Sequence, residues 1–133
     1  MKKILIISAS PRANSNSEAL AKAFARGALE ADVLVFATPI YYYEMSGQLK
    51  TLLDRLNPLF PSDYAFRDVY LLTSAAEDEE QVPQRAVNGV EGWIDCFERA
   101  KLAGTVFMGG VTAAGENPAH PALDLAYRMG KEV

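Results

Sequence analysis

The stretch Lys3–Ser17, KILIISASPRANSNS, joins a short apolar run to a loop rich in hydroxyl and amide groups. The run Ile4–Ile7 has no polar break, which is typical of a strand covered on both faces of a parallel sheet. Ser15 followed by Glu18 forms a capping box, so we expect a helix to begin directly after the loop. Free N–H groups and the helix dipole favour an anion such as phosphate at this junction.

The same loop also has a simpler interpretation as a turn followed by a helix cap, because Ser and Asn readily bond to the backbone. A cap needs one such residue, whereas this loop carries several, together with Arg12. Arginine forms charge-assisted hydrogen bonds with phosphate. The loop matches neither GxGxxG nor GxxxxGK[ST], so neither the dinucleotide fingerprint nor the P-loop fingerprint applies.

Apolar runs and helical stripes alternate along the chain. Four runs are expected to be strands: residues 4–7, 33–37 (ended by Thr38-Pro39), 69–73 and 105–111. Four stripes are expected to be helices: Ala21, Phe24, Ala25 and Ala28; Leu49, Leu52, Leu53 and Leu56, capped near Ser46; Ala86, Val90, Trp93, Ile94 and Phe97; and Leu123, Ala126 and Tyr127 after Pro121. This alternation predicts an α/β fold with a parallel sheet, whose ligands bind at the carboxyl edge of the strands.

Composition limits the classes of function. The chain of 133 residues is expected to form one domain over residues 1–133. A net charge of −4 without a basic run argues against nucleic acid, and no apolar stretch is long enough to span a membrane. The single cysteine, Cys96, excludes an internal disulfide and an all-cysteine metal site in this chain. We expect no signal peptide and a cytoplasmic protein.

A second unusual loop follows the predicted strand at residues 33–37. It contains three consecutive tyrosines, Tyr41–Tyr43, which cannot all face a core. The rings could pack on neighbouring segments or on another subunit, or they could line a pocket for a flat aromatic ligand.

Three motifs together resemble the NAD(P)H-dependent FMN reductase and iron–sulfur flavoprotein group of the flavodoxin-like superfamily. They are ISxSPRxxSNS at residues 7–17, TPIYYYxMSGQLKTLLDR at 38–55 and AGENPAHPALDLAY at 114–127. The resemblance implies a three-layer α/β sandwich with a parallel sheet in the order 2-1-3-4-5. It also implies FMN as the cofactor and NAD(P)H as the co-substrate.

The resemblance assigns cofactor-binding residues to three loops. The first would hold the phosphate of FMN with Ser8, Ser10, Arg12, Ser15, Asn16 and Ser17. The second would line the ribityl chain and the isoalloxazine ring with Pro39, Ile40, Tyr41, Tyr42 and Tyr43. The third would meet the pyrimidine edge with Ser74, Ala75 and Ala76. No side-chain acid or base and no metal is assigned, because the cofactor carries the chemistry.

The sequence departs from this family in one place. The first helix leads almost directly to the strand at residue 33, so a strand–helix unit of roughly 30 residues is absent between Arg26 and Asp32. Either the fold is a natural four-stranded variant with Gly27 as a helix C-cap, or a segment is missing from this sequence, which we favour. In iron–sulfur flavoprotein relatives the cysteine motif lies in this interval, so no cluster is expected.

The resemblance implies an oxidoreductase that takes hydride from NAD(P)H and passes electrons to a quinone, a nitro or azo compound, a flavin or an iron acceptor. The alternatives are a flavodoxin-type one-electron carrier without its own NAD(P)H site and a binding module without cofactor. A homodimer or homotetramer is expected, with the Tyr41–Met45 segment available for contact.

Three further features have modest interpretations. The acidic run Glu77–Glu80 is expected at a helix start, where the helix dipole favours negative charge. His120, between Pro118 and Pro121, is expected to cap or pack at a helix entrance. Cys96 is expected to be inert within its helix.

Overall fold

The computed structural model describes residues 1–8 and 27–133. Its strands are β1 (Ile4–Ser8), β2 (Val33–Tyr41), β3 (Glu44–Met45), β4 (Asp68–Ser74) and β5 (Lys101–Met108). Its helices are α2 (Gly47–Arg55), the short 3-10 helix η1 (Asn57–Leu59), α3 (Gln84–Ile94) and α4 (Pro121–Glu132). Residues 27–30 are also helical, and Ala28 is fully buried.

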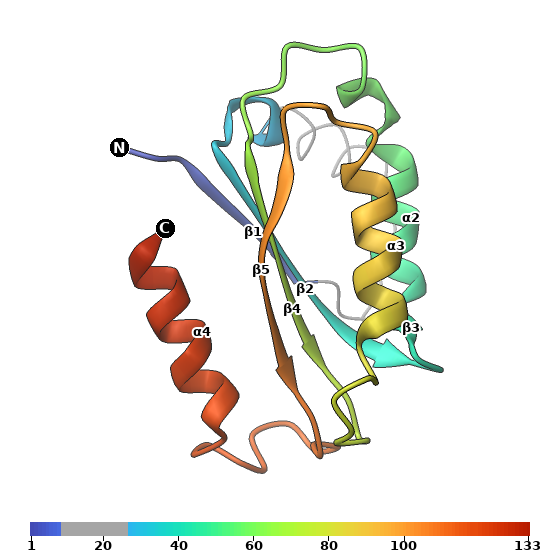
Figure 1. Cartoon of the computed structure of the whole chain (residues 1–133), viewed down its shortest axis with the longest axis vertical. Coiled ribbons are helices and arrows are strands. Elements are labelled where there is room, and N and C mark those ends of the chain that lie inside the picture. Colours follow the sequence, from blue (N-terminus) through green and yellow to red (C-terminus); the bar gives the residue numbers. More distant parts are fainter. Residues whose placement is uncertain (9–26) are drawn as a thin grey trace.

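The four long strands form a parallel sheet in the order β1-β2-β4-β5, and β3 pairs antiparallel with the end of β2. Helices α2 and α3 lie on one side of this sheet and α4 lies on the other (Figure 1). This arrangement confirms the predicted α/β class with a parallel sheet. The order equals the expected 2-1-3-4-5 with the second strand absent from the described part of the chain.

The core between the sheet and helices α2 and α3 is rich in aromatic side chains. Phe66 and Phe36 are fully buried, and Phe97 is 3% exposed. The Phe66 ring lies 5.3 Å from the Phe97 ring and 6.1 Å from the Trp93 ring, measured between centroids. The predicted α3 stripe of Ala86, Val90 and Ile94 faces this cluster, which explains why that helix forms where it does.

The connection between the first helical residues and β2 closes tightly against the start of β1. The Lys3 carbonyl accepts hydrogen bonds from the N–H groups of Asp32 (2.8 Å) and Val33 (3.2 Å). The Lys3 N–H in turn donates to the Asp32 carboxylate at 2.8 Å. Gly27 belongs to the helical stretch 27–30, so it does not end the helix as a C-cap, which the less favoured four-stranded alternative had supposed.

Several element boundaries also differ from the predictions. Strand β2 continues through Thr38 and Pro39, because β1 ends opposite Ala37 and no described strand flanks Pro39 on that side. Strand β5 starts earlier than residue 105 and ends at Met108. The acidic run Glu77–Glu80 lies in the loop before α3, which begins only at Gln84 and has no acidic residue in its first turn.

Helix α4 turns a different face to the sheet from the one predicted. Ala122 is buried, whereas Leu123 is 46% exposed and Tyr127 is 67% exposed. Of the predicted stripe, only Ala126 lies on the sheet side, where it lines a pocket together with Met129 and Val133. No helix in residues 1–8 and 27–133 is long and apolar enough to cross a membrane.

Candidate functional site

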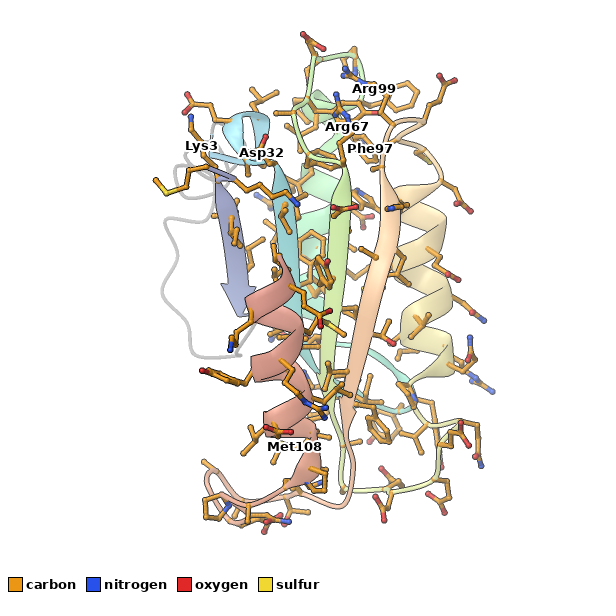
Figure 2. The ribbon with its side chains drawn as sticks, turned by 60° about the vertical axis from the view of Figure 1, so that its left-hand side comes forward. Lys3, Asp32, Arg67, Phe97, Arg99 and Met108 are labelled. Carbon is orange, nitrogen blue, oxygen red and sulfur yellow. The ribbon has the colours of Figure 1, made fainter. Side chains whose placement is uncertain are left out.

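The carboxyl ends of the parallel strands bring three predicted loops to one edge of the sheet. Pro39 of β2 is paired with Ser74 of β4, and Ser74 is paired with Met108 of β5. Ser8, the last residue of β1, is paired with Ala37. Figure 2 shows Met108 at this end of the sheet, with Lys3, Asp32 and Arg99 at the opposite end. The candidate site is therefore the edge formed by the ends of β1, β2, β4 and β5.

Two of the three tyrosines form the turn between β2 and β3. Tyr41 is paired with Glu44, so Tyr42 and Tyr43 are the two central residues of the hairpin. Both have positive φ, 51° and 65°, which is the pattern of a type I′ turn and costs energy for a bulky side chain. Tyr42 is 96% exposed and Tyr43 49%. The turn holds two aromatic rings in solvent at the edge of the candidate site.

A buried pair of hydroxyl groups fixes the base of this turn. The Thr38 Oγ1 accepts a hydrogen bond from the Ser46 N–H at 3.0 Å and lies 3.2 Å from the Ser46 Oγ. The Ser46 Oγ also accepts from the N–H of Leu49 at 3.3 Å, which caps α2 as the sequence predicts. Thr38 and Ser46 thereby join the end of β2 to the start of α2 across the tyrosine turn.

Replacing Ser46 by Ala should lower the free energy of unfolding by about 1–2 kcal/mol, because the change removes the side-chain cap of α2 and the buried contact between the Ser46 and Thr38 hydroxyl groups. Urea denaturation of the purified protein measures this difference. Gln48→Ala, an exposed change in the same helix, is the control and should stay within about 0.5 kcal/mol of wild type. Equal stabilities for the two variants would contradict this role of Ser46.

The loop after β4 contributes main-chain groups to the edge. Ser74 is half-buried, Ala75 is 5% exposed and Ala76 is exposed. The N–H of Ala75 donates to the Met108 carbonyl at 3.0 Å and is therefore unavailable to a ligand. Ala76 and Glu77 donate to no described acceptor, so this loop can offer their N–H groups to a ligand.

The loop after β5 lines an open pocket of about 350 Å³ next to Ser74. Met108 and residues 111–117 form the rest of its lining. Glu116 folds back onto the loop: its carboxylate accepts from the Thr112 N–H and lies 3.3 Å from the Thr112 hydroxyl. Backbone hydrogen bonds from Thr112 and then Ala113 lower the pKa of Glu116.

This lowered pKa predicts a pH dependence of the loop. A carboxyl group with a depressed folded pKa contributes stability above its unfolded pKa, and that contribution is lost as the pH falls through the folded pKa. The amide proton of Thr112 should therefore keep its hydrogen-bonded NMR shift at neutral pH and change only below 4.5, the ordinary pKa. A midpoint at or above 4.5 would show that the contact does not hold the carboxylate.

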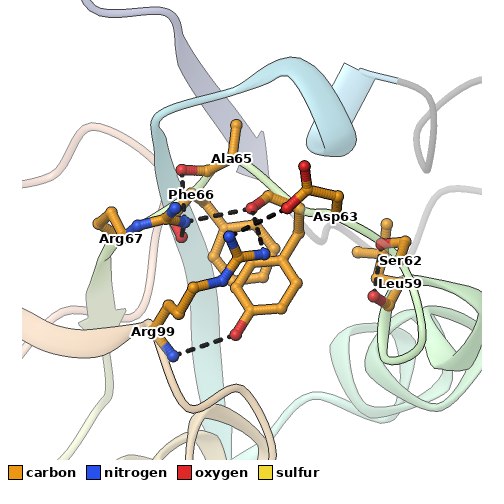
Figure 3. Close-up of polar contacts among 8 residues, drawn as sticks. Leu59, Ser62, Asp63, Ala65, Phe66, Arg67 and Arg99 are labelled. Carbon is orange, nitrogen blue, oxygen red and sulfur yellow. Dashed lines mark hydrogen bonds and ion pairs between the residues drawn. The ribbon is translucent and has the colours of Figure 1, made fainter.

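A polar cluster at the opposite end of the sheet has a structural role (Figure 3). Arg67 donates to the carbonyls of Tyr64, Ala65 and Phe66 at 2.9–3.1 Å. Arg99 donates to the Tyr64 carbonyl at 3.0 Å, and its guanidinium lies 4.3 Å from the centre of the Tyr64 ring. These contacts fix the loop before β4, far from the candidate site.

The predicted site residues fall into three groups. Pro39, Tyr41, Tyr42, Tyr43, Ser74 and Ala76 lie at the carboxyl edge with exposed or half-buried side chains, whereas the side chains of Ile40 and Ala75 belong to the core. Ser8 ends β1 at the same edge. Ser10, Arg12, Ser15, Asn16 and Ser17 lie outside the described residues. No group of three or more potential metal ligands occurs within residues 1–8 and 27–133.

The sequence predictions did not include the support of the edge by the loop after β5. Gly109 is buried against Asp78, and the His120 ring contacts the Gly109 carbonyl. The pair Gly109-Gly110 directly after an apolar strand was the available signal, since adjacent glycines mark a tight turn or a close backbone approach.

A parallel sheet in this order, with polar and aromatic loops at its carboxyl edge, defines a flavodoxin-like domain. The chain belongs to the family described as NADPH-dependent FMN reductase, whose profile matches residues 25–97, more than half of the chain. The predictions of this family and of FMN as its cofactor are thereby confirmed.

Similar proteins agree with this assignment. The Bacillus subtilis (strain 168) protein YwqN, described as an NAD(P)H-dependent FMN-containing oxidoreductase, is 29% identical over 117 aligned residues, and the match covers 77% of this chain and 61% of YwqN. The chain thus spans less than two thirds of the length of that relative.

Two solved structures share the fold. The Trp repressor binding protein from Bacillus subtilis has a TM-score of 0.73 and 22% identity, covering 95% of this chain and 96% of that chain. A flavodoxin, WrbA-like protein from Agrobacterium tumefaciens has a TM-score of 0.69 and 14% identity, covering 100% of this chain and 95% of that chain.

Proposed function

We propose that this chain is an FMN-dependent oxidoreductase that takes hydride from NAD(P)H and passes electrons to a small acceptor such as a quinone, a nitro or azo compound, a flavin or an iron centre. The observation that carries the proposal is the register that brings Ser8, Pro39 and Ser74 to one edge beside the exposed tyrosine turn. Bound FMN would supply the hydride and electron chemistry there.

The residues at this edge fit such a cofactor. A flat ring system needs aromatic surface that no core contact already uses, and Tyr42 and Tyr43 provide it. A pyrimidine carbonyl needs hydrogen-bond donors, and the N–H groups of Ala76 and Glu77 are available. A phosphate needs a charged partner, and Arg12, which follows β1 in the sequence, is proposed to supply it.

A visible absorption spectrum of the purified protein, before and after incubation with FMN, tests the cofactor. Absorption bands of a bound flavin, and a dissociation constant in the micromolar range or below, are expected. Micromolar binding needs about 8 kcal/mol, more than one helix terminus contributes, so the aromatic ring pocket has to supply much of the rest. A protein that takes up no FMN would favour a binding module without cofactor.

Anaerobic mixing with NADH or NADPH separates the enzyme from the one-electron carrier. Rapid bleaching of the flavin band is the expected result for the enzyme, because it requires a site for the pyridine nucleotide. A flavin band that persists with both nucleotides would instead support a flavodoxin-type carrier. The relative rates with NADH and NADPH would also give the preferred hydride donor.

The Arg12→Ala variant tests the phosphate assignment. Loss of a charge-assisted contact of about 1.5–3 kcal/mol should weaken FMN binding by about 10- to 150-fold. The same variant should bind riboflavin, which has no phosphate, as tightly as the wild-type protein does. If Arg12→Ala retained wild-type affinity for FMN, the phosphate would have to bind elsewhere.

We also infer that the active form is a homodimer or homotetramer. The tyrosine turn supports this inference, because the ring of Tyr42 is almost fully exposed and could be covered by a second subunit. Light scattering after size-exclusion chromatography should give a mass of two or four chains of 14.5 kDa. A monomer that binds FMN and is bleached by NAD(P)H would show that one chain completes the site.

A further inference from the structure

The loops after β4 and β5 are joined through their main chains beyond the end of the sheet. The Ala75 carbonyl accepts from the Val111 N–H at 2.9 Å, and the Glu77 carbonyl accepts from the Gly110 N–H at 3.0 Å. Together with the bond from Ala75 to Met108, these contacts make the two loops one unit. A displacement of the loop after β5 must therefore move the loop after β4.

Gly109 lies where the two loops come closest. A Cβ atom at this position would lie 2.8 Å from the Asp78 Oδ1, 2.9 Å from the Asp78 Cα and 2.9 Å from the Glu77 carbonyl oxygen. Two of these three neighbours are backbone atoms, so no change of rotamer relieves the contact. Only glycine allows the two main chains to approach this closely.

His120 connects this contact to helix α4. Its Nδ1 accepts a hydrogen bond from the Ala122 N–H at 3.1 Å and so caps the helix, as the sequence predicts. A neutral imidazole that accepts at Nδ1 carries its proton on Nε2. The Nε2–H therefore donates to the Gly109 carbonyl, which lies 3.0 Å away. One ring fixes both the start of α4 and the glycine that supports the neighbouring loop.

We propose that His120 is a positioning residue for the flavin. It holds Gly109, and through Gly109 it holds the segment Ser74–Asp78, in which the N–H groups of Ala76 and Glu77 donate to no described acceptor. The inference rests on the proposed function. It adds that a residue at the start of α4 positions the loop that is proposed to meet the pyrimidine edge of FMN. Hydrogen-bond donors that bind a flavin ring have to be kept in a fixed position by the residues around them. The contact between His120 and Gly109 would do this for the N–H groups of the loop after β4.

The variant His120→Asn separates this role from capping. Asparagine is among the best N-cap residues, so the bond to the Ala122 N–H should be kept. Its side chain is too short to reach the Gly109 carbonyl as well. In the full chain, the dissociation constant of FMN should rise by about 2- to 30-fold. The visible circular dichroism of the bound flavin should also change, while the melting temperature of the FMN-free protein stays close to wild type.

Gly109→Ala tests the same contact from the other side, and Gly92→Ala is its matched control. At Gly109 the added methyl group should separate the two loops and weaken FMN binding by at least as much as His120→Asn. Gly92 lies in the exposed part of α3, and a Cβ there meets no atom within 4 Å. Gly92→Ala should leave FMN binding unchanged. If His120→Asn fails to fold, Gly109→Ala decides the question.

The outcomes distinguish this proposal from the proposed function. A wild-type protein that takes up no FMN overturns both, because there is then no flavin to position. Wild-type binding of FMN together with unchanged affinity and unchanged circular dichroism in the variants overturns the role of His120 alone. A lowered melting temperature with an unaltered flavin signal would show that the contact only stabilises the fold.

Discussion

Replacing Phe66 by Ala should lower the free energy of unfolding by about 3–5 kcal/mol, the cost of removing a large aromatic side chain from a packed core. Phe66 is fully buried and its ring contacts those of Tyr64, Trp93 and Phe97. Native domains are stable by only about 5–15 kcal/mol, so this single change should remove a large part of the total. Chemical denaturation followed by Trp93 fluorescence measures the effect.

Phe60 provides the matched control, because it is the same residue type at the rim of the same cluster. It is 62% exposed, and its ring lies 6.4 Å from the ring of Phe97. Phe60→Ala should cost about 1 kcal/mol or less, since most of its surface already lies in water. Similar losses for Phe60→Ala and Phe66→Ala would show that the cluster does not stabilise the protein in proportion to burial.

The repeating features of the fold could be predicted from the sequence because they follow from the local pattern. The apolar run at residues 69–73 lies in β4, and the leucines Leu49 and Leu53 are the buried residues of α2. The Ser46 cap could be predicted from the same pattern, because a serine directly before a helical stripe can accept a hydrogen bond from an unpaired N–H group of the first turn.

The boundaries that were predicted wrongly depend on contacts between distant residues. Pro39 can continue β2 only because β1 stops opposite Ala37, and nothing near Pro39 in the sequence reveals that. The buried face of α4 was predicted wrongly because Leu123 and Tyr127 are exposed although their side chains are largely apolar. Ala122 is buried instead, and Met129 lies beside residues of the sheet. The helix after Glu77–Glu80 starts late because the main chain first pairs with Gly110.

In the candidate site, too, the features that follow from local sequence could be predicted, and those that depend on contacts between distant residues could not. The resemblance of the motifs located the loops at the ends of β2 and β4, and the register then brought their first residues side by side. The contact of Gly109 with Asp78 joins two loops about thirty residues apart. Such a close approach leaves no periodic pattern: the pair Gly109-Gly110 signals it in the sequence, but only the structure identifies Asp78 as the partner.

A double substitution in the tyrosine turn, Tyr42→Asn with Tyr43→Gly, should change stability and FMN binding in opposite directions. Both positions have positive φ, which costs a tyrosine about 1–2 kcal/mol each, and Asn-Gly is the preferred pair for a type I′ turn. The unfolding free energy should therefore rise, by about 1–2 kcal/mol in total, because Asn keeps part of the cost of positive φ and Gly loses more conformational freedom on folding than Tyr. Because the exposed rings are proposed to cover the isoalloxazine, the dissociation constant of FMN should rise by about tenfold or more.

The control for this experiment keeps the rings and the strained backbone but removes the hydroxyl groups. Tyr42→Phe with Tyr43→Phe should leave stability near wild type and retain most of the FMN affinity, because ring surface rather than a hydroxyl group makes the proposed contact. If the Asn-Gly variant gained stability and still bound FMN as tightly as wild type, the strain in this turn would be real but the rings would not belong to the flavin site. Strain kept at a position where a relaxed sequence is available indicates a functional use, and a loss of FMN affinity would identify that use as binding of the cofactor ring.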